Sequence, residues 1–391
     1  MKFKLLLIAA GVALTVAVPA HAREQWTPRQ AHAWYDRQPW LVGANYAPAT
    51  SVNELEMWQA ETWDPATIDR ELALAQGVGM NTMRVFLHNL LWENDPEGLK
   101  RRMDEFLTIA QRRGIRPMFV LFDSVWDPDP KAGPQRPPIP GVHNSGWVQA
   151  PGGARLADRS QYPKLEAYVK DVVGRFADDP RVLAWDVWNE PNNEGGGNYK
   201  PTPGKKQLVA GLLDDVFEWT RAANPTQPIT SGLWIGENWD KRDTLDPVER
   251  IQVTESDVNS FHDYSWPEKF EVRARQMLSY GRPVMCTEFM ARGNGSTFDG
   301  SLPIGKRLNI GMYNWGFVDG KTQTRLPWDS WKKPYTYDEP PIWFHEVFRG
   351  DGQPYRQAEV DLIRRLAREP KVAQPPVPPA QPARRRRRAA R

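Results

Sequence analysis

The feature of this sequence that most constrains its fold is a regular alternation of short apolar runs with amphipathic helical segments. The apolar runs have the length and composition of strands that are covered on both faces. They lie at residues 41–46, 81–87, 115–122, 182–190, 228–233, 257–264, 282–290 and 309–318. Strands that alternate with helices form parallel sheets, and eight such units close into a barrel. The sequence therefore predicts an α/β protein, a single (β/α)8 TIM barrel with long top-face loops.

Helical segments with their own start and stop signals separate most of these runs. Asp64 and Pro65 are typical of a helix start, and Gly79 of a helix end. Further helices are predicted at about 99–113, 162–176, 206–223, 267–280 and 357–368. The interval between the last two strands has the least convincing helical pattern. The long intervals 123–160 and 318–342 are predicted to be loops at the carboxyl ends of the strands.

Two of the predicted strands end in a carboxylate. The run 182–191 closes with Asn189, Glu190 and Pro191, and the run 282–290 carries Glu288 near its end. Barrels of this type hold their chemistry at the carboxyl ends of the strands. Two carboxyl groups about 5–5.5 Å apart are what glycoside hydrolysis with retention requires. For either residue alone, a helix cap or a solvated strand end is the alternative.

The string Asn189-Glu190-Pro191 resembles the acid/base motif of the retaining glycoside hydrolases of clan A, especially family 5. The resemblance covers about residues 41–350, with the motifs in the family's chain order. It implies that Glu190 is the acid/base residue and Glu288 the nucleophile, while Asn189 binds a sugar hydroxyl. Many members have a histidine near the end of strand three, where residues 121–126 have none. The identity of the sugar, and membership of another clan A family, therefore stay open.

Three further residues fit the same picture. Arg84 interrupts an apolar strand, where a charged side chain is rarely buried unless it is paired. Beside Glu288 it would favour the ionised carboxylate, and a structural ion pair is the alternative. His262 and Tyr264 are two residues apart on one strand and so project to one face. The tyrosine hydroxyl can position the nucleophile, and the histidine can contact the sugar or Glu190.

Aromatic side chains are numerous, with 18 tryptophans in the chain. Trp315 on the last strand is expected to form the floor under the cleaved sugar, although barrel packing is the alternative. Asp123 and Trp126 lie at the start of the first long loop and are expected to bind substrate there. Other aromatic residues of the loops are candidates for subsites without a specific assignment; they are Trp147, Trp234, Trp239, Trp266, Trp328, Trp331, Tyr335 and Tyr337.

These residues predict a retaining β-glycoside hydrolase that acts on a β-linked oligo- or polysaccharide through a covalent glycosyl-enzyme. Alternatives are an envelope-glycan transglycosylase and a catalytically lapsed barrel that binds polysaccharide. We expect no cofactor and no metal, since the sequence has no HExxH, CxxC pair, Walker loop or GxGxxG. Endo or exo action depends on whether the long loops leave a groove or close a pocket. Cys286, the single cysteine, is expected to be a buried apolar residue on the same strand face as Glu288.

The two ends of the chain differ from the rest. Residues 1–22 combine two lysines, an apolar run and Ala-His-Ala, the pattern of a bacterial Sec-type signal peptide. This pattern predicts an exported protein, periplasmic or secreted, with a catalytic domain at 23–370 and no membrane span after cleavage. Residues 371–391 are rich in Pro, Ala and Arg and are predicted to be a disordered tail.

The charge distribution argues against a nucleic-acid partner. The whole chain has a formal charge of +3, but the two lysines of 1–22 and seven basic residues of 371–391 contribute to it. Residues 23–370 therefore carry a formal charge of −6. A mildly acidic domain does not attract nucleic acid, whereas the basic tail can contact anionic envelope components through its charge.

Overall fold

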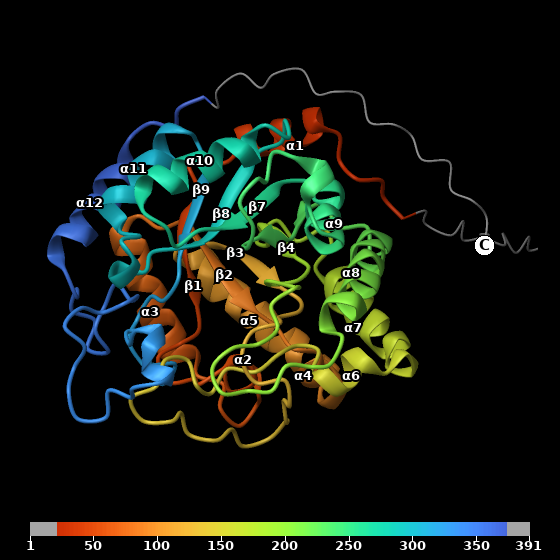
Figure 1. The fold of residues 1–391 in the computed structure, drawn as a ribbon, viewed down its shortest axis with the longest axis horizontal. Helices are drawn as coiled ribbons and strands as arrows, with labels where there is room; N and C mark the ends of the chain where they lie inside the picture. The colour runs from red at the N-terminus through yellow and green to blue at the C-terminus, as the bar shows by residue number, and fades with distance from the viewer. Residues whose placement is uncertain (1–21, 374–391) are drawn as a thin grey trace, which may run out of the picture.

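The computed structural model describes residues 22–373 of the chain. Within this range the strands form one parallel sheet, and helices surround it (Figure 1). The strands are β1 (Val42–Tyr46), β2 (Thr82–Phe86), β3 (Arg116–Val120), β4 (Ala184–Asp186), β5 (Ile229–Thr230), β6 (Gly232–Leu233), β7 (Asn259–His262), β8 (Val284–Phe289) and β9 (Gly311–Asn314). Each expected strand is present, in most cases with shorter ends than the apolar run.

The sheet is a closed barrel of eight strand positions. Its order is β5-β4-β3-β2-β1-β9-β8-β7-β6, with parallel pairing throughout. β5 and β6 are two halves of one strand separated by Ser231, so the first and last members of the sheet are continuous along the chain. At this position Ser231 N donates to the Ser256 side-chain oxygen at 3.2 Å, and the Ser231 hydroxyl donates to the Trp188 carbonyl oxygen at 2.8 Å. The predicted TIM barrel is thereby confirmed.

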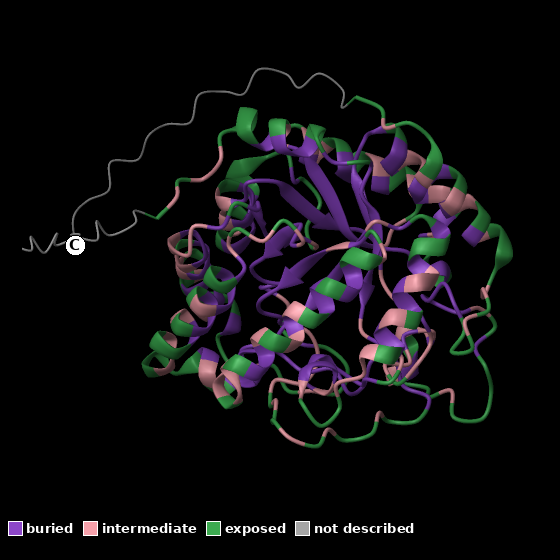
Figure 2. Cartoon of the chain, turned by 180° about the vertical axis from the view of Figure 1, so that it is seen from behind, coloured by how far each residue is buried: buried purple, intermediate pink, exposed green. Residues whose placement is uncertain are grey.

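Twelve helices of the described residues surround the barrel, and most of them pack their apolar faces on its outside. They are α1 (Pro28–Asp36), α2 (Glu54–Trp58), α3 (Pro65–Val78), α4 (Asn89–Asn94), α5 (Pro96–Arg112), α6 (Gly153–Ala157), α7 (Tyr162–Arg175), α8 (Lys205–Ala222), α9 (Pro247–Glu255), α10 (Pro267–Leu278), α11 (Phe298–Arg307) and α12 (Gln357–Arg368). Buried strands lie inside a ring of helices whose outer faces are exposed (Figure 2). This distribution is expected for a parallel sheet covered on both faces.

Local signals explain where several helices begin and end. Asp64 caps α3 by accepting a hydrogen bond from Thr67 N, and Gly79 ends this helix at φ +84°, as its sequence indicates. α5 begins three residues earlier than expected because Asp95 caps it through Gly98 N. Helix α11, between the last two strands, contains Pro303. That proline explains why its sequence has no clear helical pattern.

The N-terminal end of the barrel is closed by α1, a helix that the strand pattern did not indicate. Its Ala31, Trp34 and Tyr35 pack in one buried cluster with interior side chains of the barrel, among them Met118 and Met285. The Tyr35 hydroxyl also donates to the Asn309 carbonyl oxygen at 3.0 Å. The carboxyl ends of the strands, which carry the predicted site residues, therefore lie at the opposite, open end of the barrel.

A bulge in β8 decides which way its side chains point. Phe261 of β7 pairs with Cys286, but the next residue, His262, pairs with Glu288. One extra residue, Thr287, is thus inserted in β8, and a β-bulge of this kind re-aims the side chains that follow it. Cys286 is fully buried in the core cluster that also contains Phe261. Its expected burial is confirmed, but the expectation that it shares a face with Glu288 is wrong because of this bulge.

Candidate active site

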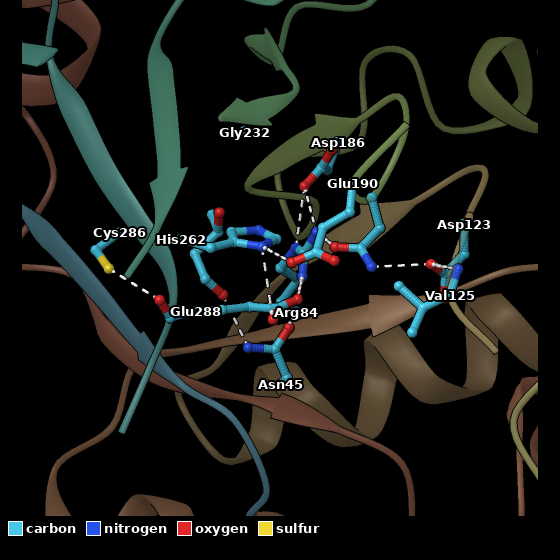
Figure 3. Close-up of polar contacts among 12 residues, drawn as sticks. Asn45, Arg84, Asp123, Val125, Asp186, Glu190, Gly232, His262, Cys286 and Glu288 are labelled. Carbon is cyan, nitrogen blue, oxygen red and sulfur yellow. Dashed lines mark hydrogen bonds and ion pairs between the residues drawn. The ribbon is translucent and has the colours of Figure 1, made fainter. Parts of the chain in front are cut away.

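The two predicted carboxylates meet at the open end of the barrel. Glu288 lies within β8, whereas Glu190 follows β4 by four residues. One oxygen of each carboxylate and one ring nitrogen of His262 lie within 4.8 Å of one another (Figure 3). This spacing is close to the separation of about 5–5.5 Å that double displacement at a glycosidic bond requires.

Arg84 is the centre of the buried charges beneath these carboxylates. Its side chain is fully buried on β2, and its Nη1 donates to Glu288 Oε1 at 2.8 Å. The same guanidinium donates to Asp186 Oδ2 from Nε and Nη2, at 3.0 and 2.8 Å. Asn45 Oδ1 and Asn189 Oδ1 accept its remaining hydrogen bonds, at 2.8 and 2.7 Å. A buried cation with this many partners is held in one position.

Tyr264 and His262 complete the surroundings of the carboxylates. The Tyr264 hydroxyl donates to Glu288 Oε2 at 2.8 Å, so both oxygens of Glu288 are engaged. His262 Nδ1 is 2.9 Å from Glu190 Oε1 and 3.5 Å from Glu288 Oε2. Burial lowers the pKa of His262 to about 4, so this imidazole is neutral at pH 7. A neutral ring can exchange a hydrogen bond with Glu190 without adding charge.

Glu190 is protonated more readily than an ordinary glutamate. Burial raises its pKa to about 7, against the opposing effects of the Asn193 hydrogen bond and the Arg84 charge. Asn193 Nδ2 donates to Glu190 Oε2 at 2.7 Å. Desolvation is the cause of this upward shift in the pKa. A carboxylic acid with this pKa can donate a proton at neutral pH.

Glu288 has direct partners that favour its ionised form. Burial and the neighbouring Glu190 raise its pKa, whereas Arg84 and the Tyr264 hydroxyl act in the other direction. Among residues 22–373, no guanidinium forms a hydrogen bond or ion pair with Glu190, whereas Glu288 forms a 2.8 Å ion pair with Arg84. The two carboxyl groups therefore have different partners, which is the usual way in which one site separates an acid from a nucleophile.

Asp186 is a site residue that the sequence analysis missed. It lies at the end of β4, is fully buried and pairs with Arg84. The available signal was an aspartate within an apolar strand, two residues before Trp188. Such a residue is rarely buried without a partner, and the guanidinium of Arg84 is that partner. Asn45 and Asn193 were missed as well, since an isolated asparagine near a strand end has no distinctive pattern.

Asp123 supports the site instead of facing the substrate space. Its Oδ1 accepts from Asn189 Nδ2 at 2.9 Å, and its Oδ2 accepts from Trp147 Nε1 at 2.6 Å. Burial raises its pKa to about 6. An amide nitrogen has two hydrogens, so Asn189 keeps one donor for a sugar hydroxyl. Asp123 thus orients Asn189.

A cavity of about 230 Å³ opens above the carboxylates. Trp126 and Trp315, both expected here, line it together with Trp234 and Trp328. The remaining lining residues are Val125, His143, Asn144, Asn189, Glu190, Asn193, Gly195, Tyr264 and Glu288. Trp126 stacks on Trp331 at 4.9 Å between ring centroids and so joins two long loops.

Other aromatic candidates lie elsewhere. Trp239 is fully buried in the core, and Trp147 is buried behind Trp315, with its ring 6.1 Å away. Trp266 and Tyr337 are exposed, at 66% and 96%, and do not line the cavity. Loop position alone therefore did not identify which aromatic side chains face the carboxylates.

Glu190, His262 and Glu288 are also close enough to hold a metal ion. Both oxygens of Glu288 already accept hydrogen bonds from Arg84 and Tyr264, and the Arg84 guanidinium carries the positive charge that a metal would supply. The arrangement suits proton transfer and nucleophilic attack with these side chains alone. Among residues 22–373, no helix has both the length and the apolar character that a membrane crossing requires.

Comparisons with known proteins identify relatives of this barrel. A family model described as cellulase (glycosyl hydrolase family 5) matches residues 43–331. A probable mannan endo-1,4-beta-mannosidase F from Aspergillus flavus is 22% identical over 223 residues, which cover 51% of this chain and 43% of that protein. The chain thus spans about half the length of the curated relatives it matches.

Solved structures share the fold. A GH5_18 protein from Streptomyces cattleya in complex with GlcNAc matches with a TM-score of 0.57 and 14% identity, covering 88% of this chain and 82% of that chain. An endo-beta-1,4-mannanase from Thermotoga petrophila matches with a TM-score of 0.54 and 13% identity, covering 85% and 77%. At these identities the likeness concerns the fold.

Proposed function

Because the chain belongs to glycosyl hydrolase family 5, we propose that it is a retaining β-glycosidase with Glu190 as acid/base residue and Glu288 as nucleophile. The observation that carries this proposal is the pair of buried carboxylates with different partners within 4.8 Å of each other. Arg84 and Tyr264 hold Glu288, while burial keeps Glu190 protonated near neutral pH.

The reaction follows from these positions. Glu190 donates its proton to the glycosidic oxygen as the bond between this oxygen and the anomeric carbon breaks. Glu288 attacks the anomeric carbon, and a covalent glycosyl-enzyme forms. The ionised Glu190 then takes a proton from water, whose oxygen displaces Glu288 and restores both residues. Two displacements at one carbon give net retention. Asn189, oriented by Asp123, donates its free amide hydrogen to a hydroxyl of the same sugar.

The substrate class is proposed to be a β-linked oligo- or polysaccharide. The names of several curated relatives concern mannan with β-1,4 links, so β-mannosides are the first substrates to test. Aryl β-mannosides, β-glucosides, β-xylosides and β-galactosides, together with mannan, glucan and xylan, form a suitable panel. Activity on one member of this panel would identify the sugar.

Two variants test the assignment of roles. Glu288→Ala is expected to lose hydrolysis by more than about 1,000-fold and to regain turnover of an activated aryl glycoside with added azide, which replaces the missing nucleophile. Glu190→Gln is expected to lose more activity on poor leaving groups than on activated ones, because only the former need the acid. A Glu288→Ala protein that remained fully active would contradict the nucleophile assignment, and equal losses for Glu190→Gln would contradict the acid assignment.

Export and domain boundaries are also proposals. Residues 1–21 and 374–391 lie outside the described residues, so the signal peptide at 1–22 and most of the basic tail at 371–391 rest on sequence pattern. We propose that the catalytic domain spans 23–370 and acts outside the cytoplasm. Fractionation of producing cells, with N-terminal sequencing of the exported protein, tests the cleavage after residue 22.

A further inference from the structure

A second, smaller cavity lies beside the active-site cavity. Its volume is about 30 Å³, and Trp315 and Asn144 line both cavities. The other walls come from the end of β1, from Phe86 of β2 and from the loop that follows β9, including Glu346. A space of this volume holds a water molecule or one hydroxyl group. It is too small for a sugar ring.

Two side chains in the wall of this small cavity have polar atoms without partners. Glu346 and Asn144 are each 1% exposed. Glu346 Oε1 accepts a hydrogen bond from Thr324 Oγ1, but Oε2 has no partner among the described residues. In the same part of the chain, neither Asn144 Oδ1 nor Asn144 Nδ2 has one. An unpaired buried polar atom costs about 1–3 kcal/mol, so these three atoms indicate a polar ligand.

The backbone at both residues has an uncommon conformation. Asn144 has φ +47° and Glu346 has φ +60°, in the left-handed region. Such residues cluster at binding sites, where the surrounding structure holds them in place. Asn144 comes from the loop after β3 and Glu346 from the segment between β9 and α12. These two segments are joined by a hydrogen bond from Asn144 N to the Thr322 carbonyl oxygen at 2.9 Å. The fold thus places both side chains next to Trp315.

The small cavity lies on one side of the bond to be cleaved. Glu190 and Asn193 follow β4, and Trp234 follows β6, so the leaving group extends toward these elements. Trp315 follows β9, which pairs with the nucleophile's strand β8. The sugar attacked by Glu288 therefore rests against Trp315. Beyond this sugar, the cavity that Trp315 shares with the joined loops has a volume of about 30 Å³.

We propose that Glu346 and Asn144 bind a hydroxyl group of the terminal, non-reducing sugar, so that the enzyme removes sugar units from chain ends. This inference rests on the proposed glycosidase function and adds its mode of action. Burial raises the pKa of Glu346 to about 8. At neutral pH its carboxyl group is therefore an acid, which can donate a hydrogen bond from Oε2 to a sugar hydroxyl.

The mode of action is tested on the wild-type protein first. A β-linked hexasaccharide of the preferred sugar, labelled at its reducing end, is digested and sampled with time. Action on chain ends gives labelled products that shorten by one unit at a time. Early labelled products of two or three units, without the five-unit product, would show internal cleavage and overturn the proposal.

The hydroxyl site is tested with aryl glycosides that each lack one hydroxyl. Wild-type protein is expected to discriminate against one deoxy sugar by about 10-fold or more in kcat/KM, because that sugar leaves Glu346 or Asn144 unpaired. Glycine adopts the left-handed backbone conformation readily, so it is the suitable replacement at both positions. Glu346→Gly and Asn144→Gly are expected to bring the ratio of kcat/KM for the parent and deoxy sugars close to one. Glu346→Gln keeps a hydrogen-bond donor at this position. This variant is expected to retain most of the wild-type discrimination against the deoxy sugar.

Glu249→Gln is the matched control. Glu249 on α9 is another buried carboxyl group, with a pKa raised by burial, and it accepts a hydrogen bond from Asp246 N without lining either cavity. Its substitution is expected to leave the deoxy ratio unchanged. If the small cavity holds only water, Glu346→Gly lowers activity on parent and deoxy substrates equally, and the proposal fails. A wild-type protein without activity on any β-glycoside would instead contradict the proposed function itself.

Discussion

At the scale of single residues, Glu190 is held in a strained position that favours its proposed role. It has φ +44°, a left-handed conformation that is uncommon for residues other than glycine. The turn directs its carboxyl group to His262 Nδ1, and Asn193 holds the second oxygen. Strain of this kind persists where the surrounding structure determines the position, and it is common at catalytic sites.

The pH dependence of activity follows from the two carboxyl groups. The free enzyme needs Glu190 protonated and Glu288 ionised, so kcat/KM should have a bell-shaped profile. With the pKa of Glu190 at about 7, activity is expected to fall as the pH rises through about 7. The acidic limb reports the pKa of Glu288. Because burial raises this pKa, the acidic limb should lie at a higher pH than an ordinary glutamate would give. In Glu190→Gln the alkaline limb should disappear. If the alkaline limb persisted in this variant, a group other than Glu190 would cause it.

Tyr264→Phe tests the hydrogen bond to the nucleophile. The variant loses the 2.8 Å bond from the hydroxyl to Glu288 Oε2, a donor that lowers the pKa of Glu288. We expect kcat/KM to fall about 10- to 100-fold and the acidic limb of the pH profile to move to higher pH. Titration of kcat/KM in both proteins measures the shift. An unchanged acidic limb would mean that Tyr264 acts only on substrate.

At the scale of elements, α8 anchors the first long loop through one buried lysine. Lys205 is 2% exposed, and its Nζ donates to the Ser124 carbonyl oxygen and to Gln149 Oε1, both at 2.8 Å. Gln149 Nε2 in turn donates to the Trp126 carbonyl oxygen at 2.7 Å. This chain of contacts connects a helix on the outside of the barrel with an aromatic wall of the active-site cavity.

Lys205→Met is therefore expected to disturb substrate binding from a distance. The loss of both hydrogen bonds should lower the free energy of unfolding by about 1–3 kcal/mol and raise KM more than it lowers kcat. Lys206→Met is the matched control, since Lys206 is the next residue of α8 and is exposed. Steady-state kinetics and thermal unfolding of both variants check this. Equal KM values in the two variants would show that Lys205 does not position the loop.

At the scale of the whole molecule, α1 seals the closed end of the barrel. Its buried side chains cover interior residues such as Met118 and Met285, and Arg23 before it forms a 2.5 Å ion pair with the buried Asp257. The helix thus belongs to the folding unit, although it precedes the first strand.

Two truncations test this role. A protein that starts at residue 39 should be insoluble or should unfold at a temperature at least about 10 °C lower, since it exposes large apolar side chains. A protein that ends at residue 373 is the control, and its unfolding temperature should equal that of the 23–391 protein. Equal unfolding temperatures for the first truncation and the control would show that α1 is dispensable.

Much of this architecture follows from local pattern. The eight apolar runs predicted the strands, and their polar ends identified Glu190 and Glu288, because strand period and strand termination are properties of neighbouring residues. A charge within an apolar strand and the period-two spacing of strands then predicted Arg84, His262 and Tyr264 near these carboxylates. Each of these side chains lies on a strand or within four residues after one, where barrel geometry determines its place.

What only the tertiary structure decided depends on residues far apart in the chain. The pairing of Arg84 with Asp186, the role of Asp123 as a support for Asn189, and the meeting of Asn144 with Glu346 each join segments 66 or more residues apart. The bulge at Thr287 likewise arises from pairing with β7 and β9. Local sequence determines which residues form strands and carry charge, whereas packing between distant loops determines what those charges face. The reason is that desolvation and hydrogen-bond pairing depend on all the atoms around a group.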